Sequence, residues 1–325
     1  MEMISPMLAK SIDAVPDTEG LLFEPKWDGF RAIVHVTAEG VEIHGRSKPL
    51  TRYFPELVAA FASLPPAILD GEIVLRSGPA GNERLDWELL SQRIHPADSR
   101  VQKLAVETPA QFVAFDRLDL GFDVPFADRR TALEELSLTP PIFRTQTTTD
   151  ADEARRWLVE FEGAGLDGVI AKPLDAAYAP GKRVMFKIKH HRTADVVLLG
   201  YRVHKSGSGV GSLLLGLYDA DGELQNVGGV SAFSDKRRLE LVDELAPLVT
   251  GTGERERTRF TSGKDTSFVM LEPSRVLEVR YDQMEGPRFR HTVQFERWRP
   301  DRDPRSCTFD QLEIPVAYDL TQVLS

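Results

Sequence analysis

Cysteine is almost absent from this sequence of 325 residues, with Cys307 as its single example. One cysteine excludes an intramolecular disulfide and any zinc site built on paired cysteines. Long apolar runs are also missing: no stretch approaches about 18 apolar residues, and residues 1–6 lack the basic and apolar regions of a secretory signal. These absences predict a soluble, cytoplasmic protein that does not enter a membrane.

The common signatures of nucleotide-binding and hydrolytic sites are absent too. No Gly-x-x-x-x-Gly-Lys-Ser/Thr phosphate loop occurs, and Gly207, Gly209 and Gly211 indicate a hairpin rather than a dinucleotide fingerprint. Neither a zinc-protease helix motif nor a serine nucleophile elbow is present. Any chemistry must therefore come from other residue patterns.

Basic residues are fewer than acidic ones, and the net charge of -10 argues against bulk attraction to nucleic acid. Three local runs are nonetheless basic. Residues 182–192 hold five Lys or Arg and no acid, residues 288–305 hold six Arg against three acids, and Arg46, Lys48 and Arg52 form a cluster. A solvated surface is the ordinary explanation for one such run. Three of them favour phosphate binding.

Strand-like and helix-like segments predict an α+β domain over residues 1–190. Because regular crossover helices do not separate the strands, mixed and largely antiparallel sheets are favoured over a doubly wound sheet. Thr149 and Asp150 supply an N-cap for the last helix. Strands are expected at 32–36, 41–44, 67–75, 111–115 and 168–172, and helices at 55–64, 85–94, 129–136 and 152–163.

After residue 190 the sequence changes character. Short strand-like runs occupy 196–202, 212–218, 223–230 and 275–281, and one helix-like segment spans 235–248. Several short strands with one helix are compatible with a small Greek-key barrel such as the OB-fold. We therefore expect a second domain, an OB-fold β-barrel, over residues 191–325.

Lys26 is the most informative single residue. It lies between Pro25 and Trp27 in an otherwise apolar stretch and is followed by Asp28 and Gly29. A primary amine held beside other cations and partly out of water loses its proton more readily and can act as a nucleophile. A lysine that extends from a strand edge to solvent is the ordinary alternative.

Carboxylates interrupt two apolar strands. Asp70 and Glu72 flank a glycine, and strand alternation places both on one face. Buried carboxylates are costly unless they are paired or bind a ligand hydroxyl or a metal, although a hairpin turn at Asp-Gly is an alternative. Asp167 precedes a second such strand, which ends at Lys172.

Two further features suggest phosphate and base contacts. Lys187 and Lys189 alternate with apolar residues, so both amines could face one phosphate. Phe115 ends the apolar run 112–114, where its ring could stack on a base or simply fill the core.

Taken in order, these segments resemble the motif series of the covalent nucleotidyltransferases, specifically the ATP-dependent DNA ligases. The flanking residues 6–9 and 295–301 look most like compact bacterial ligases, the stand-alone ligase C and the ligase domain of ligase D. The matching segments are 26–31 (Lys-Trp-Asp-Gly-Phe-Arg), Arg46 with 54–57, 69–72, 115–116, 167–172, 187–189 and 299–302.

This resemblance implies a reaction in three steps. Lys26 would attack the α-phosphate of ATP, release pyrophosphate and carry AMP. AMP would pass to the 5′-phosphate of a nick, and the adjoining 3′-hydroxyl would displace it. Asp28, Lys187 and Lys189 would share in catalysis, with Asp28 orienting Lys26 or acting at sealing.

The resemblance also implies the binding residues. Arg31 and Glu72 would contact the ribose, Phe115 and Ile170 would enclose adenine, and Glu72 and Asp167 would bind Mg²⁺, with Mn²⁺ as an alternative. The full nucleotide-binding and phosphate-binding set that it implies is Glu24, Lys26, Arg31, Arg46, Glu72, Phe115, Ile170, Lys187, Lys189, Arg299 and Arg302.

Two positions depart from the family pattern. Asp167 replaces the usual Glu, and Arg302 replaces the usual Lys. Other members of the superfamily, an RNA ligase or an mRNA-capping guanylyltransferase, remain alternatives, as does a non-catalytic OB-fold protein that binds nucleic acid.

The expected partners are ATP and nicked duplex DNA, in DNA repair, recombination or replication. We expect a monomer in the bacterial nucleoid that depends on a repair polymerase or end-binding proteins on other chains. The last motif lies in the predicted second domain, so a hinge is expected near residues 190–194.

Overall fold

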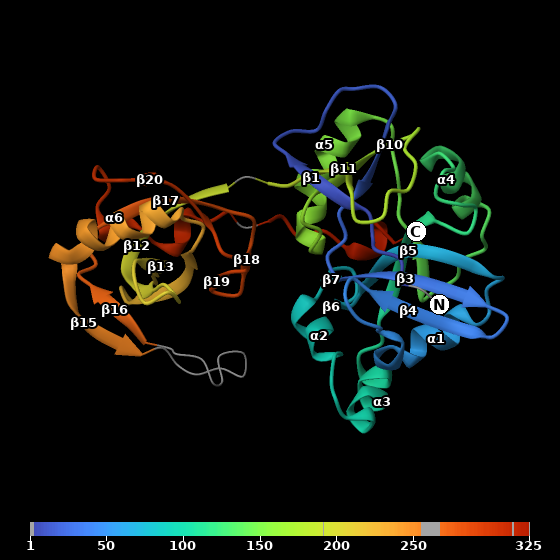
Figure 1. Ribbon diagram of the computed structural model, residues 1–325, viewed down its shortest axis with the longest axis horizontal. Helices are drawn as coiled ribbons and strands as arrows, with labels where there is room; N and C mark the ends of the chain where they lie inside the picture. Colours follow the sequence, from blue (N-terminus) through green and yellow to red (C-terminus); the bar gives the residue numbers. More distant parts are fainter. Residues whose placement is uncertain (1–2, 191, 255–266, 314, 325) are drawn as a thin grey trace. The chain divides into compact units, whose positions relative to one another are not determined.

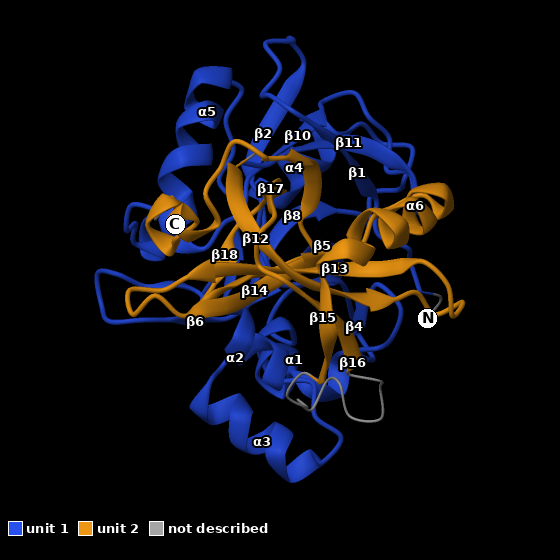
Figure 2. Cartoon of the chain, turned by 90° about the vertical axis from the view of Figure 1, so that its left-hand side faces the viewer, with its two compact units in different colours: residues 1–190, 315–325 blue, residues 191–314 orange. Residues whose placement is uncertain are grey.

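The computed structural model describes residues 3–190, 192–254, 267–313 and 315–324. They group into two compact units: unit 1 comprises Met1–His190 with Pro315–Ser325, and unit 2 comprises His191–Ile314 (Figure 2). The expected second domain, 191–325, differs from unit 2 in its last residues. Leu320 is fully buried in unit 1 and its N–H donates to the Glu83 carbonyl over 2.9 Å.

Unit 1 contains two larger sheets that are mostly antiparallel, as the sequence predicted (Figure 1). Only the β8–β9 and β1–β11 ladders within them are parallel. The five-stranded sheet has the order β4 (Gly40–Gly45), β3 (Phe30–Thr37), β5 (Ala67–Val74), β8 (Gln111–Arg117) and β9 (Ile142–Arg144). The four-stranded sheet has the order β1 (Leu8–Ile12), β11 (Arg183–Ile188), β10 (Val169–Pro173) and β2 (Leu21–Pro25).

The four helices predicted for this unit are present, and the carboxylate of Asp150 caps the last by accepting the N–H of Asp152 over 2.8 Å. A further helix, α3, was not predicted because only Val101 and Leu104 of its ten residues are buried. The helices are α1 (Pro55–Phe61), α2 (Trp87–Gln92), α3 (Asp98–Glu107), α4 (Phe126–Glu134) and α5 (Ala151–Glu160). Short elements are η1 (Thr51–Tyr53), η2 (Phe161–Ala164), η6 (Leu320–Gln322) and the pair β6 (Arg76–Ser77) and β7 (Arg84–Leu85).

Unit 2 is an antiparallel sheet that curls into a half-barrel of the OB-fold type. The long strand β12 (Arg192–Val203) pairs along one edge first with β17 (Val276–Tyr281) and then with β16 (Ser267–Leu271), so the sheet bends along it. The other strands are β13 (Val210–Tyr218), β14 (Leu224–Val230), β15 (Val249–Glu254) and β20 (Gln294–Trp298), with the hairpin β18 (Met284–Glu285) and β19 (Arg288–Phe289).

The predicted helix of unit 2 is α6 (Asp235–Leu245), which buries Leu241 and Leu245 in the core of this unit. Strands β15, β16 and β20 were not predicted; β15 has the sequence Val-Thr-Gly-Thr-Gly-Glu and no fully buried residue, so it carries little apolar signal. Short 3₁₀ turns are η3 (Ala246–Leu248), η4 (Pro304–Ser306) and η5 (Phe309–Gln311). Within the described residues, no helix has both the length and the apolar character that crossing a membrane requires.

Two buried histidines of the five-stranded sheet predict a loss of stability in acid. The rings of His35 and His44 are 5.2 Å apart, and burial, followed by repulsion from His44, lowers the pKa of His35 below 6.5. Because the unfolded chain then binds the extra proton, the free energy of unfolding should fall as pH drops below about 6.5.

Urea titrations at pH 7.5 and 5.5 test this expectation. In His35→Leu, the change of the free energy of unfolding with pH should be smaller by up to ~1.4 kcal/mol per pH unit. The reason is that one proton is no longer taken up on unfolding. His291→Asn, at an exposed position, is the control and should not change the slope. An unchanged slope in His35→Leu would assign the acid sensitivity to other groups.

Candidate active site

Lys26 directly follows β2, at the edge of the four-stranded sheet, and its backbone N–H donates to the Gly168 carbonyl over 2.8 Å. Its amine lies 2.6 Å from Oδ1 of Asp167, and the amine of Lys189 lies 2.8 Å from Oδ2 of the same carboxylate. The structure thus brings three of the predicted site residues into direct contact, with one carboxylate between two amines.

The electrostatic balance at Asp167 favours its anion. Burial would raise the pKa of this carboxyl, but the charges of Lys26 and Lys189 and the hydrogen bonds from both amines outweigh burial, and the pKa is lowered. The Lys26 side chain keeps 20% of its surface exposed, whereas Asp167 keeps 7%. The Lys26 side chain therefore stays partly exposed in this ion pair.

Glycines let the backbone close tightly around Lys26. A Cβ at Gly168 would lie 2.1 Å from the carbonyl oxygen of Ile188, and its φ of +149° is rarely adopted by other residues. A Cβ at Gly29 would lie 2.0 Å from the carbonyl oxygen of Ile73. Trp27 is buried and donates its indole N–H to Thr145 over 2.8 Å, which anchors the segment that carries Lys26.

One face of the four-stranded sheet carries three more predicted residues. Ile170 of β10 lies opposite Glu24 of β2 and opposite Lys187 of β11. Side chains that lie directly opposite on neighbouring strands share a face. The adjacent cross-strand row packs into the core and consists of Phe23, Ala171 and Phe186.

The five-stranded sheet pairs Arg31 with two carboxylates. The guanidinium donates to both oxygens of Asp70, over 2.6 and 2.7 Å, and Glu72 lies directly opposite Arg31 across β3 and β5. Burial alone would lower the pKa of Arg31. The charge and hydrogen bonds of Asp70 outweigh burial, so the pKa of Arg31 is raised. The alternative of a hairpin at Asp70 and Gly71 is wrong, because both lie inside β5.

Glu72 combines burial with three nearby cations. Burial raises its pKa to about 7, against the attraction of Arg31, Lys26 and Arg46, and Asp28 adds a smaller upward effect. Arg46 itself is exposed beyond β4. A larger share of Glu72 is therefore protonated near neutral pH than of an ordinary glutamate.

This titration predicts a pH dependence of self-adenylation. The rate should rise as pH increases through about 7, because ionised Glu72 can accept a ribose hydroxyl or bind a cation. Glu72→Gln should lower the adenylation rate at pH 8 by about 10²-fold and should remove the rise of this rate through about pH 7. Single-turnover labelling from pH 6 to 9 measures both effects. A profile that keeps the same midpoint in Glu72→Gln would assign the titration to another group.

Phe115 is buried at the end of β8 with cations against its ring. The guanidinium carbon of Arg31 is 4.3 Å and the amine of Lys172 is 4.5 Å from the ring centroid. Lys172 also lies 2.7 Å from Oε1 of Glu24, while Oε2 of Glu24 is buried with no hydrogen-bond partner among the described residues.

Sequence reasoning assigned no role to Lys172, although its position at the end of an apolar strand was a signal. Burial raises the pKa of its partner Glu24, and the charge of Lys172 opposes that effect. Arg52 of the first basic cluster along the chain lies 2.7 Å from Asp98 of the unpredicted helix α3.

The last motif forms a cluster within unit 2. Arg299 donates to both oxygens of Asp195, over 2.9 and 3.0 Å, and to Asp301 over 2.8 Å. The Nε of Arg302 lies 3.5 Å from Asp195. Asp195 was not predicted, since no motif includes it.

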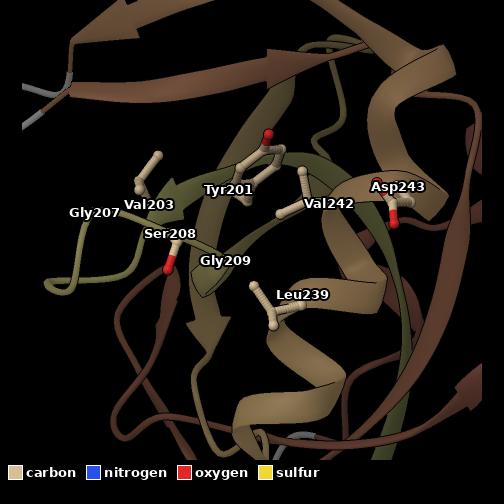
Figure 3. Close-up of a pocket in the computed structure, with 8 residues that line it drawn as sticks. All are labelled: Tyr201, Val203, Gly207, Ser208, Gly209, Leu239, Val242 and Asp243. Carbon is tan, nitrogen blue, oxygen red and sulfur yellow. The ribbon is translucent and has the colours of Figure 1, made fainter.

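A pocket of about 400 Å³ also lies in unit 2, and no predicted site residue lines it. It opens between the loop that joins β12 to β13 and helix α6, where the side chains of Leu239 and Val242 point toward Tyr201 and the loop (Figure 3). The pocket is therefore separate from the lysine and carboxylate site.

A lysine paired with a buried carboxylate, further lysines on the adjacent strand and an OB-type second unit define a covalent nucleotidyltransferase. The family model for the ATP dependent DNA ligase domain matches residues 6–189, and that for the ATP dependent DNA ligase C terminal region matches residues 206–302. The chain belongs to the ATP-dependent DNA ligases. The activity is thus nick sealing through adenylation, which decides among the alternatives that the sequence left open.

Relatives resemble the chain over its whole length. DNA ligase C of Mycobacterium tuberculosis is 53% identical, and the alignment covers 100% of this chain and 98% of the relative. DNA ligase C1 of Mycolicibacterium smegmatis is also 53% identical, over 99% of this chain and 97% of the relative. A solved structure from a study of Lig E DNA ligases has a TM-score of 0.61 at 18% identity, over 92% of this chain and 100% of the other, which supports the fold.

Proposed function

We propose that Lys26 is the residue that carries AMP in this ligase. The observation that supports the proposal most directly is the partly exposed side chain of Lys26, whose amine lies 2.6 Å from the buried carboxylate of Asp167. The amine would attack the α-phosphorus of ATP, so that an N–P bond forms and the P–O bond to pyrophosphate breaks, and the amine loses a proton.

The neighbouring lysines would stabilise the reacting phosphate. Lys187 shares a sheet face with Ile170, and Lys189 reaches Asp167 from the residue after β11. Cations fixed at a phosphoryl group act mainly on the charge that develops in the transition state. AMP would then pass to the 5′-phosphate of a nick, bound by Arg46, and the 3′-hydroxyl would displace it.

The nucleotide would lie between the two sheets of unit 1. Arg31 and Glu72 would bind the ribose, Phe115 and Ile170 would enclose the adenine, and the unpartnered oxygen of Glu24 would accept a hydrogen bond from it. These roles follow from the family resemblance together with the burial and pairing of each side chain.

A divalent cation fits this carboxylate set only with help from the nucleotide. Among the described residues, no group of three or more His, Cys, Asp or Glu side chains could hold a metal ion. Mg²⁺ is commonly bound by one or two carboxylates together with substrate phosphates, and Glu72 and Asp167 would supply these carboxylates. Bound Mg²⁺ would neutralise phosphate charge, and Mn²⁺ would serve as an alternative.

The boundary near residue 190 between the two predicted domains also remains part of the proposal, whereas residues 315–324 group with unit 1. Arg299 and Arg302, organised by Asp195 and Asp301, would bind pyrophosphate during adenylation. This role requires unit 2 to approach the nucleotide at that step and to leave it before sealing. The proposed hinge lies near residue 190, because residues 192–194 of the expected range pair with β17 and residue 191 lies outside the described residues.

The biological setting follows from this chemistry. We infer that the enzyme works as a monomer on nicked duplex DNA in the bacterial nucleoid, in repair with a polymerase or end-binding proteins on other chains. Phosphate contacts through the basic clusters should make DNA binding fall steeply with salt.

Labelling experiments test the proposal. The protein is incubated with Mg²⁺ and α-labelled ATP or GTP, and the label on the chain is measured, followed by transfer to nicked duplex DNA or to a nick with RNA strands. Label from ATP that appears on the nicked DNA and is lost on sealing supports the proposal. Label from GTP alone, or transfer to RNA alone, would contradict it.

A further inference from the structure

Tyr178 is a buried tyrosine outside every ligase motif, on the segment between β10 and β11. Its side chain belongs to a small core cluster with Met7, Ile33 and Met185. Its hydroxyl donates to Oδ2 of Asp70 over 2.6 Å and accepts the backbone N–H of Met7 over 3.1 Å. Burial, followed by the charge of Asp70, raises the pKa of this phenol, so it remains a donor throughout the working pH range.

Asp70 connects this hydroxyl to the nucleotide site. Its carboxylate has no exposed surface and accepts three hydrogen bonds, one from Tyr178 and two from Arg31. Two parallel bonds from a guanidinium fix its plane relative to the carboxylate. The third bond, from Tyr178, reaches Oδ2, which also accepts from Arg31, so the hydroxyl fixes the position of an oxygen that the guanidinium binds.

Arg31 in turn lies over the ring of Phe115, with its guanidinium carbon 4.3 Å from the centroid. A continuous series of contacts therefore runs from the backbone of Met7 through Tyr178, Asp70 and Arg31 to Phe115. Both sheets of unit 1 contribute to it, since β10 and β11 flank Tyr178 while β5 and β3 carry the carboxylate and the guanidinium.

We propose that Tyr178 is a positioning residue for ATP: its hydroxyl orients Asp70 and thereby aims Arg31 at the ribose. The inference rests on the proposed contact between Arg31 and the ribose. Without the hydroxyl, Oδ2 of Asp70 loses a donor and the N–H of Met7 loses its acceptor, so the buried carboxylate reorients and the guanidinium turns with it.

The test is the preference for ATP over 2′-deoxy-ATP in single-turnover adenylation of the full chain. Tyr178→Phe keeps the ring and removes the hydroxyl. We expect the apparent KM for ATP to rise about tenfold, with a smaller change in the maximal rate and in the KM for 2′-deoxy-ATP, so that the preference largely disappears. Phe122→Leu is the matched control: it alters packing 5.5 Å from the tyrosine ring but leaves the hydroxyl and the preference intact.

Arg31→Lys and the double variant Arg31→Lys/Tyr178→Phe distinguish the contact between Arg31 and the ribose from the positioning role of Tyr178. If the positioning role holds, Arg31→Lys loses the same preference, and adding Tyr178→Phe causes no further loss. If Arg31→Lys keeps the preference, the contact between Arg31 and the ribose is wrong and the positioning role of Tyr178 falls with it, whereas the proposal for Lys26 stands. If Arg31→Lys loses it but Tyr178→Phe shifts both nucleotides equally or lowers only the Tm, Tyr178 merely stabilises the fold.

Discussion

Lys26→Ala protein should take up no label from α-labelled ATP, whereas the unchanged protein becomes labelled on its chain. Alanine has no group that can form the N–P bond, and no second amine is placed at the same point against Asp167: Lys189 binds its other oxygen. Overall sealing of nicked duplex DNA should fall by at least about 10³-fold, measured by gel separation of the joined strand.

The matched control is Lys10→Ala, an exposed lysine of β1 in the same sheet, which should be labelled normally. A nick that already carries 5′-adenylate should still be sealed by Lys26→Ala, because that step no longer needs the amine as a carrier. Label on the Lys26→Ala chain would refute the assignment.

Arg129→Met should give the largest loss of stability, about 3–5 kcal/mol in the free energy of unfolding of unit 1. Arg129 is fully buried and donates to both oxygens of Asp116, over 2.8 and 2.9 Å. It also donates to the carbonyls of Val124 and Ala176. Methionine would leave Asp116, which is 1% exposed, as an unpaired buried charge.

The double variant Arg129→Met/Asp116→Leu distinguishes an unpaired charge from lost packing. Replacing both partners of a buried ion pair by apolar groups is often nearly neutral, so most of the lost stability should return. Urea unfolding followed by tryptophan fluorescence suits the test, because Trp27, Trp87 and Trp157 all belong to unit 1. A double variant no more stable than Arg129→Met would show that packing dominates.

Local sequence was sufficient to single out the candidate site residues. Lys26, Glu72, Asp167 and Lys189 each interrupt an apolar segment or follow it directly, and charges there are unusual enough to be noticed without a structure. Strand alternation likewise predicted that Lys187 and Lys189 act together. These signals are short-range, so they do not depend on how the strands are paired.

The partners of these residues were not predictable in the same way. Asp70 appeared to be a candidate ligand, yet the structure pairs it with Arg31 and Tyr178, which are 39 and 108 positions away. Such contacts depend on strand register and on which sheet faces which. Helix α3 and the buried segment around Leu320 were not predicted, because each segment contains only a few apolar residues.

The return of residues 315–324 to unit 1 means that the chain crosses between the units twice. A protease that cuts once, near residue 190, would separate the sequence into two fragments without freeing unit 2, which stays joined to the buried segment around Leu320. Release would require a second cut near residue 314. The two units should therefore copurify after limited digestion at one connection.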